Sequence, residues 1–326
     1  MKRIKVIVIM LIATLGLVAC GGQSSKTDLL NIGVIQFTSH EALENVYDGF
    51  IEGLSQLGLV ENEDFTIDFN NAQADAATLE TIADKLVNNK SDLILAIATP
   101  AAQAVANKTT EIPILFGAVT DAASAGLVIS NDKPETNVSG VSDLTPIKSQ
   151  IELIKALDPN AKDVAVMYAN SEDNSRFQAD IAKVEIEALG MNYIGASVSD
   201  ANQIQQMTES IITKVDAIYV PTDNLVSESF GIVAELANNH EVLTVVGEIA
   251  MVNKGGLITN GINYFNSGLV VAEMAKAILV DNDEIETMAV EYLKDEELEL
   301  AVSLSTMEIL KVKIDQTILD EAIKVK

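Results

Sequence analysis

The most restrictive feature of this sequence is a regular alternation of short β-rich runs with amphipathic helical patterns. Residues 31–36 have the composition of a strand, and 41–57 carries apolar residues at helical spacing. The pattern continues with expected strands at 65–70, 92–98 and 112–117 and an expected helix at 76–88. The run 92–98 is almost continuously apolar, as a central strand buried on both faces requires. Such alternation predicts an α/β fold built from parallel βαβ units.

With 326 residues the chain is longer than one hydrophobic core usually serves, so we expect two lobes. A second alternating series begins after Val141. Its expected helices are 147–157, 176–189, 202–212 and 227–239, and its expected strands are 163–168, 192–196, 217–220 and 243–246. Residues 257–261 and a helix at 267–280 are then expected to return the chain to the first lobe.

These assignments predict where the lobes and their hinge lie. Chain crossings near 142–146 and 255–261 would form a hinge of several strands. Lobe 1 would comprise 29–143 plus about 262–290, and lobe 2 would comprise 144–261 plus about 291–326. The acid-rich stretch 281–299 is expected to be a solvated surface segment.

The amino terminus has the features of a secretory signal. Basic residues at positions 2, 3 and 5 precede an apolar run, 6–19, that is short for a membrane span. The run ends in Leu17-Val18-Ala19-Cys20, which resembles the bacterial lipobox, where the cysteine carries diacylglycerol. The sequence thus predicts a signal peptide (1–19), a lipid-modified Cys20 and a tether (20–28) that hold the protein on the outer face of the cytoplasmic membrane; the alternative is an incidental cysteine.

Composition and motifs exclude several classes of function. The formal net charge of −27 works against nucleic-acid binding, which needs a cationic surface. One cysteine and two histidines cannot build a disulfide framework or a Cys/His zinc cluster, and we expect no cofactor and no metal. The sequence contains no G-x-S-x-G elbow, Walker loop, H-E-x-x-H motif or G-x-G-x-x-G after a strand. It therefore favours holding a ligand over transforming one, and we expect no catalytic residues.

Ligands of open α/β sheets bind beyond the carboxyl ends of the strands, so the loops after the strands provide the candidate site. Thr99, Ala101 and Ala102 follow strand 92–98 beside Pro100, where a helix start with accessible backbone N–H groups would bind a carboxylate. A plain helix cap is the alternative. Further candidates are Gln36, Phe37 and His40 after the first strand, Thr120 and Asp121 after the fourth, Asn174 and Ser175 after strand 163–168, and Asp223 and Asn224 after strand 217–220.

These further candidates also have structural alternatives. Phe37 or His40 would stack on an aromatic ligand, or be surface or packing residues. Asp223 would pair with an ammonium group, or begin a helix. The polar residues at 120–121 and 170–175 would contact a ligand, or cap the following turn or helix.

Several separated motifs resemble the substrate-binding lipoproteins of ABC importers. These motifs are 32–36, 40–43, 49–50, 92–94, 98–104 (ATPAAQA) and 112–116. Segments 172–175 (EDNS), 216–224 (DAIYVPTDN) and 261–264 (GINY) are similar to the group that includes tryptophan- and tyrosine-binding members. The resemblance extends over most of the chain, from about Asn31 to Ala277.

The resemblance implies two Rossmann-like lobes with parallel sheets, joined by a multi-strand hinge and closing on a ligand, in the manner of periplasmic binding proteins. It implies a membrane permease and an ATPase as partners. It also favours Thr99, Asn174, Ser175 and Asp223 as ligand contacts rather than caps.

The narrower resemblance implies an aromatic amino acid as the ligand. Its carboxylate would lie near Pro100 and its ammonium group at Asp223. The ring would lie against aromatic or imidazole side chains, namely Phe37, His40, Phe116 or Tyr264. The alternatives are a different small solute, such as a branched-chain amino acid, a sugar or a peptide, and a secreted sensor or adhesin with the same fold.

Overall fold

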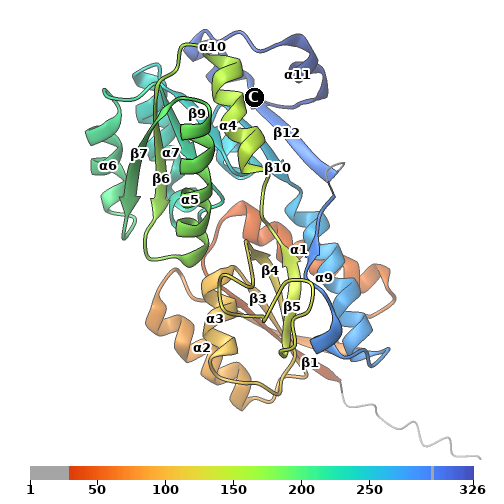
Figure 1. The fold of residues 1–326 in the computed structure, drawn as a ribbon. Helices are drawn as coiled ribbons and strands as arrows, with labels where there is room; N and C mark the ends of the chain where they lie inside the picture. Colours follow the sequence, from red (N-terminus) through yellow and green to blue (C-terminus); the bar gives the residue numbers. More distant parts are fainter. Residues whose placement is uncertain (1–28, 295–296) are drawn as a thin grey trace, which may run out of the picture.

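Two separate sheets organise the computed structural model, which describes residues 29–294 and 297–326 (Figure 1). The expected signal peptide, Cys20 and the tether to residue 28 lie outside the described residues. Within the described part of the chain, no helix combines the length and apolarity that a membrane span requires.

The first sheet belongs to lobe 1 and has six strands in the order β11-β5-β4-β3-β1-β2. All of its strand pairs are parallel. Its elements are β1 (Leu30–Gln36), α1 (Glu41–Gln56), β2 (Phe65–Asn71), α2 (Ala76–Asn88), β3 (Leu93–Ile97), α3 (Thr99–Ala106), β4 (Ile114–Val119), β5 (Val138–Ser142), α9 (Tyr264–Leu279), the short 3₁₀ helix η1 (Ile285–Thr287) and β11 (Glu291–Tyr292).

The second sheet belongs to lobe 2 and has seven strands in the order β13-β12-β10-β9-β8-β6-β7. The pairing of β10 with β12 is antiparallel, whereas the other pairs are parallel. Its elements are α4 (Ile147–Leu157), β6 (Asp163–Ala169), α5 (Asp173–Ala188), β7 (Asn192–Val198), α6 (Gln203–Ile211), β8 (Ala217–Val220), α7 (Asn224–Asn239), β9 (Leu243–Val246), α8 (Ile249–Asn253), β10 (Ile258–Ile262), β12 (Leu298–Ser303), α10 (Leu304–Leu310), α11 (Gln316–Glu321) and β13 (Ile323–Val325).

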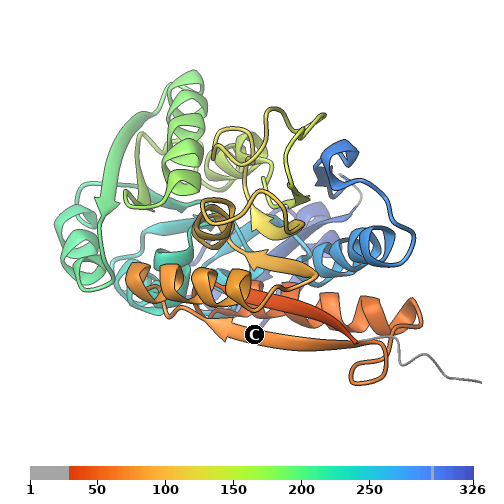
Figure 2. The ribbon, with the colours of Figure 1, turned by 90° about the horizontal axis from the view of Figure 1, so that it is seen from below.

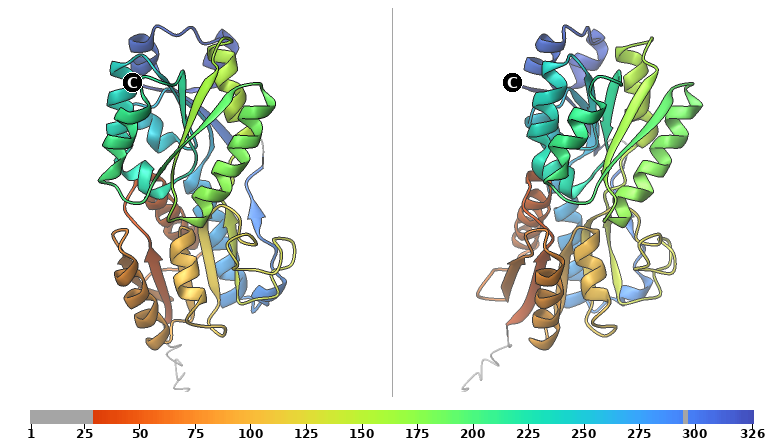
Figure 3. Two further views of the ribbon diagram at one scale, coloured as in Figure 1. Left: turned by 60° about the vertical axis from the view of Figure 1, so that its left-hand side comes forward. Right: turned by 90° about the vertical axis from the view of Figure 1, so that its left-hand side faces the viewer.

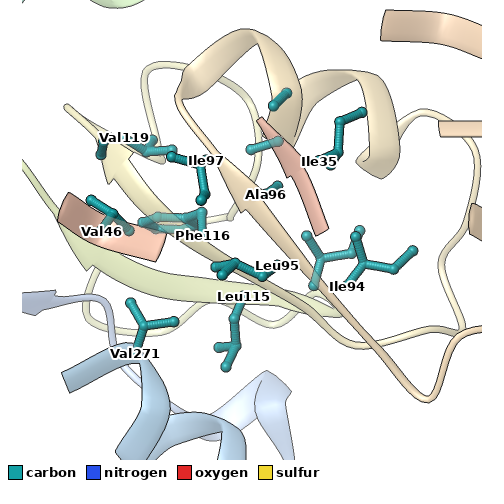
Figure 4. Close-up of a cluster of buried hydrophobic side chains, with 14 of the residues drawn as sticks. Ile35, Val46, Ile94, Leu95, Ala96, Ile97, Leu115, Phe116, Val119 and Val271 are labelled. Atoms are coloured by element: carbon teal, nitrogen blue, oxygen red, sulfur yellow. The ribbon is translucent and has the colours of Figure 1, made fainter. Parts of the chain in front are cut away.

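Helices cover both faces of the lobe 1 sheet, with α2 and α3 on one side and α1 and α9 on the other (Figure 2). Every residue of β3 and β4 is buried, which explains their continuous apolar composition. Val46 from α1, Val271 from α9 and Phe116 from β4 lie together in the core between the sheet and its helices (Figure 4). The core of lobe 1 is built mainly from its own elements, and Ala250 of α8 and Ile262 of β10 join it from lobe 2.

The chain crosses between the lobes at several points. It leaves lobe 1 between β5 and α4, re-enters after β10, and returns to lobe 2 between β11 and β12. Near the crossings, Gln150 of α4 donates to the carbonyl groups of Gly247 and Asn260 and accepts from the Tyr219 hydroxyl at 2.6 Å. This buried network fixes the lobe 2 end of the hinge.

The sequence predicted the element types well and some boundaries less well. The structure confirms the predicted bounds of α2, α4, β8 and β9. Helices α5, α7 and α9 each begin three residues before the predicted start, directly after the residue that occupies the N-cap position. The second crossing likewise follows Ile262 rather than lying within 255–261, since β10 is still part of the second sheet.

The acid-rich stretch 281–299 was expected to be solvated, and this is wrong for part of it. Ile285 and Val290 are buried against the lobe 1 core. Glu291 and Tyr292 pair with β5 in the first sheet, so the last crossing follows Tyr292 instead of residue 290. Burial of two apolar side chains and pairing with β5 thus outweighed the local density of charge.

Helices α1 and α9 pack at very short distance because glycines face each other across the contact. A Cβ atom added at Gly49 would lie 2.1 Å from the Phe265 carbonyl oxygen, and one added at Gly268 would lie 2.2 Å from the Val46 carbonyl oxygen. No side chain larger than hydrogen fits at either position without separating the helices. This contact holds the last long helix of lobe 1 against the first.

We predict that Gly49→Ala destabilises the protein by about 1–3 kcal/mol, because overpacking outweighs the helix propensity gained with alanine. The urea midpoint of unfolding measures the effect. Gly231→Ala in α7 is the matched control, since a Cβ added at that position would have nothing within 4 Å and the substitution should be neutral or stabilising. Equal midpoints for Gly49→Ala and the unmodified protein would contradict the close packing.

Candidate functional site

The carboxyl ends of the two sheets face each other across the boundary between the lobes (Figure 3). The loops after β1, β3 and β4 therefore meet the loops after β6, β8 and β9. This is the arrangement in which α/β sheets bind ligands, and it collects most of the residues that the sequence singled out.

Polar contacts join the two lobes at this boundary. His40 Nε2 lies 3.3 Å from Asn224 Oδ1, and Gln178 Nε2 donates to Thr120 Oγ1 at 3.2 Å. Thr38 Oγ1 donates to Glu228 at 2.9 Å, Gln103 Nε2 to Asp173 at 2.8 Å, and Asn253 Nδ2 to Glu41 at 2.8 Å. The lobes are thus held together here by hydrogen bonds between side chains, a type of contact that separates more easily than an apolar core.

Four buried polar atoms at the boundary have no hydrogen-bond partner among the described residues. They are Gln36 Oε1, His40 Nδ1 and Thr99 Oγ1 of lobe 1 and Asn174 Oδ1 of lobe 2. An unsatisfied buried donor or acceptor typically costs about 1–3 kcal/mol, so native proteins rarely retain one without a reason. Four of them at facing strand ends indicate a site for a polar ligand.

Buried carboxyl groups concentrate at the same boundary. Asp143, Glu172, Asp223 and Glu248 are each no more than 5% exposed. Burial is the main reason that the pKa is raised to about 6 for Asp143 and to about 7 for Glu248. Burial, followed by the charge of Asp223, raises the pKa of Glu172 to about 8, and burial also raises the pKa of Asp223.

His40 is the basic side chain within this acidic group, and the described residues include no buried lysine or arginine. Burial lowers the pKa of His40 to about 4, so the imidazole is neutral at physiological pH. Asn224 donates its amide hydrogen to Glu172 and presents Oδ1 to His40. His40 Nε2 therefore carries the proton, which leaves Nδ1 as an acceptor.

A chain of hydrogen bonds connects the hinge to lobe 2. Tyr264 donates to Asp143 at 3.0 Å, and Thr120 donates to the other oxygen of Asp143 at 2.9 Å. Thr120 in turn accepts from Gln178, whose side-chain oxygen accepts from the Thr222 hydroxyl at 2.9 Å. All five residues are buried, so closure of the lobes completes this chain.

Most of the predicted site residues are at the boundary, although several have additional structural roles. Buried there are Gln36, His40, Thr99, Thr120, Asn174, Ser175, Asp223 and Asn224. Asp223 is the N-cap of α7 and accepts from the backbone N–H groups of Val226 and Ala169. The helix-start alternative therefore holds for Asp223, and its use by a ligand stays a prediction.

The start of α3 differs from the expectation. Ala98 occupies the N-cap position with a φ of 84°, and Thr99 is the first helical residue rather than the cap. The N–H groups of Ala101 and Ala102 both donate to the Ala98 carbonyl at 3.1 Å, so they are not free for a ligand as the sequence suggested. The Thr99 hydroxyl is the unpartnered group at this helix start.

The structure does not bring Phe116 or Asp121 to the boundary. Phe116 is fully buried within the lobe 1 core, where its β4 position directs it against Val46 (Figure 4). Asp121 accepts from Ser124 and Asn131 within its own loop. Phe37 and Tyr264 are packed against the lobe 1 core as well, but Tyr264 extends its hydroxyl to Asp143.

Sequence reasoning missed several buried polar residues at the boundary. They are Asp143, Gln178, Thr222 and Glu248. Glu248 follows β9 after a single glycine, so the strand-end rule would have found it. The signal for Gln178 was weak, because a glutamine one turn into a helix is most often exposed.

A metal centre has no support here, since the described residues contain no cluster of three or more His, Cys, Asp or Glu side chains placed to hold an ion. The site offers carboxylates, amides and hydroxyls that are already joined to one another. Its chemistry is that of recognition by hydrogen bonds and charge.

Comparison with known proteins gives consistent results. A family model described as ABC transporter substrate binding protein matches residues 31–326. A curated protein of Clostridioides difficile (strain R20291), the "Tyrosine-binding protein", is 40% identical over 260 residues, which cover 79% of this chain and 75% of that protein. The relationship thus includes both lobes and the boundary between them.

Two solved structures also differ in how well they match. An ABC domain from Streptococcus pneumoniae in complex with L-Trp has a TM-score of 0.87 at 34% identity, covering 91% of this chain and 100% of that one. A ligand-free, open substrate-binding protein with adhesive properties from Clostridium difficile has a TM-score of only 0.71 at 37% identity, covering 91% and 99%. The lower score despite the higher identity indicates that the lobes here are closer to their arrangement in the L-Trp complex.

We predict that the free energy of unfolding falls as the pH rises from 6.5 to 8.5. A carboxyl whose pKa is raised by folding stabilises the protein while protonated, and this contribution is lost as the pH rises through the folded-state pKa of about 7 for Glu248 and about 8 for Glu172. Burial lowers the pKa of His40 to about 4, so His40 changes the free energy of unfolding only below the ordinary histidine pKa of 6.5.

The test is urea unfolding at several pH values. Glu172→Gln should reduce the loss between pH 6.5 and 8.5 by about 1–2 kcal/mol. The control is Glu187→Gln, on the exposed face of α5, which should leave the pH profile unchanged. A profile for Glu172→Gln that overlays that of the unmodified protein would contradict the assignment.

Proposed function

The chain belongs to the ABC transporter substrate-binding protein family, whose members bind solutes and are not enzymes, and we propose that it binds an aromatic amino acid between its lobes. The observation that carries this proposal is the set of unpartnered buried polar atoms at the facing strand ends. Support for an aromatic ligand comes from the relative named as tyrosine-binding and from the L-Trp complex.

The ligand's carboxylate would bind at the start of α3. The Thr99 hydroxyl is buried without a partner there, and the amino end of a helix favours negative charge. This mode of binding requires no basic side chain, in agreement with the absence of buried lysine and arginine from the described residues. The unpartnered side-chain oxygens of Gln36 and Asn174 are acceptors, so they would accept hydrogen bonds from donor groups of the ligand and not from its carboxylate.

The aromatic ring would supply most of the affinity. Burying about 150–250 Å² at about 25 cal/mol/Å² contributes roughly 4–6 kcal/mol, against about 8 kcal/mol for a micromolar complex. Phe37 and Tyr264 are the predicted ring contacts that border the boundary between the lobes. The polar ends of the ligand would then fix its orientation.

Binding would be coupled to closure of the lobes. The inter-lobe contacts are hydrogen bonds between side chains, and the homologue described as open scores lower than the L-Trp complex. A ligand that contacts both lobes shifts the population towards the closed form. An ABC permease and its ATPase, the expected partners, would respond to that form.

We also propose that Cys20 carries the lipid that anchors the protein to the outer face of the cytoplasmic membrane. The support is the sequence alone: a basic start, an apolar run and the lipobox-like Leu17-Val18-Ala19-Cys20. Mass spectrometry of the membrane-bound protein would detect the acylated cysteine.

An adhesive role is a second candidate, because one homologue of 37% identity is described as having adhesive properties. Such a role would use the exposed outer surface and does not compete with ligand binding between the lobes. Permease and ATPase reading frames beside the gene would favour import, and attachment of the purified protein to host cells would favour adhesion.

Isothermal titration calorimetry with the twenty amino acids tests the main proposal. We predict that one or two aromatic amino acids bind with dissociation constants of about micromolar or below, since ring burial and the polar ends together supply about 8 kcal/mol. Binding of a sugar or a peptide, together with no response to any amino acid, would refute the proposed ligand class.

Thr99→Val should lower the affinity for the aromatic amino acid by about 10–100-fold, because a hydrogen bond to a charged group contributes about 1.5–3 kcal/mol. The unfolding midpoint of the ligand-free protein should stay equal or increase, since the hydroxyl removed has no partner. Thr81→Val on the exposed face of α2 is the control and should leave affinity unchanged. Unchanged affinity for Thr99→Val would show that the carboxylate is bound elsewhere.

A further inference from the structure

The buried groups at the lobe boundary carry an excess of acidic side chains. Four carboxyl groups and one histidine are buried there, while every lysine and arginine among the described residues is at least partly exposed. Burying a carboxyl without a counter-charge is costly. A bound cation would offset that cost, so the question is which carboxyl faces a position that a cation can occupy.

Asp223, which the sequence suggested as the partner of the ammonium group, already accepts hydrogen bonds from the protein with both oxygens. Its Oδ2 accepts from the Ala169 N–H at 2.6 Å and its Oδ1 from the Val226 N–H at 2.8 Å. Glu172 is similarly occupied, accepting from Asn224 and from the Leu225 N–H. Asp143 accepts from Thr120 and Tyr264. Each of these three carboxyls uses both oxygens for protein donors.

Glu248 has a different environment. Its Oε1 accepts from the Ser227 hydroxyl and lies 3.9 Å from His40 Nδ1. That nitrogen is a buried acceptor with no partner, because the proton of the imidazole is on Nε2 facing Asn224. When Glu248 is ionised, a state that a cation beside it would favour, two acceptors face each other across the boundary, His40 from lobe 1 and Glu248 from lobe 2.

The separation of these two atoms suits a shared donor. A nitrogen at about 2.9 Å from each acceptor fits between atoms 3.9 Å apart, and an ammonium group has hydrogens for both. A chloride or carboxylate would be repelled by the same pair. The position also requires both lobes, so a group bound there would hold them closed.

We propose that His40 Nδ1 and Glu248 Oε1 together bind the α-ammonium group of the ligand, making Glu248 a determinant of selectivity for amino acids over the corresponding acids. This inference rests on the proposed function. It replaces Asp223 as the ammonium partner and gives the unpartnered nitrogen of His40 a role.

Calorimetry with matched ligand pairs tests the inference. The probes are L-tyrosine and L-tryptophan, each compared with its deamino analogue, hydroxyphenylpropionate or indolepropionate. In the unmodified protein, loss of the ammonium group should weaken binding by at least about 100-fold, and in Glu248→Gln by less than about 10-fold. Glu228→Gln, which changes another boundary carboxyl, and Asp223→Asn should both retain most of the penalty.

The outcomes separate the two proposals. If the unmodified protein binds neither amino acid, the proposed function fails, and this inference with it. If the amino acids bind but Glu248→Gln retains the full penalty, or Asp223→Asn abolishes it, the ammonium group is held elsewhere and only this inference fails.

A measurement on the unmodified protein avoids dependence on any variant. The chain has two histidines, His40 and His240, so their ¹⁵N NMR signals are readily distinguished. Saturation with the amino acid should shift the Nδ1 signal of His40, as a hydrogen bond is donated to it, and leave His240 unchanged. An unshifted His40 Nδ1 signal at saturation would overturn the proposal.

Discussion

The burial of carboxyl groups at the meeting point of the two lobes is the constraint on which the site depends. Asp143, Glu172 and Asp223 retain their places because hydroxyl, amide and backbone N–H donors surround them. Those donors come from α7, the loop after β4 and the first residue of α9, so the carboxyls also tie these elements together. When ionised, the same carboxyls would repel an anionic group, so the proposed position for the ligand's carboxylate is at the start of α3 in lobe 1, beside Thr99.

The mechanics follow from where apolar and polar contacts lie. Each lobe has a core of its own, and the close α1–α9 contact keeps lobe 1 together although α9 follows lobe 2 in sequence. The lobes meet mainly through hydrogen bonds, such as that between Gln178 and Thr120. When such an interface opens, hydrogen bonds to water replace the hydrogen bonds between side chains. Opening therefore costs less free energy than disrupting an apolar core. We therefore expect the lobes to move as rigid bodies about the crossings between them, as the proposed coupling of binding to closure requires.

The sequence predicted the fold better than the site because periodicity is a property of many residues, whereas a site depends on a few. Buried strands such as β8 and β9 were bounded correctly by their continuous apolar runs. Strand β5 (VSGVS) was not predicted because its glycine and serines interrupt the apolar pattern of a buried strand. Asp143, which follows it, was missed for the same reason. The strand-end rule found His40, Thr99 and Asn224, but it cannot distinguish a ligand contact from a helix start, which geometry decided for Asp223.

The proposed binding mode would favour a zwitterion over an acid or an amine alone because of the groups at the boundary. In the closed arrangement, lobe 1 presents an unpartnered hydroxyl at a helix start, while His40 and Glu248 present acceptors from both lobes. An acid would satisfy the helix start but leave His40 Nδ1 without a donor and Glu248 without a counter-charge, and an amine would do the reverse. Only a ligand with both groups removes both penalties, and it does so only when the lobes are together. Closure and selectivity are therefore consequences of the same unpaired groups.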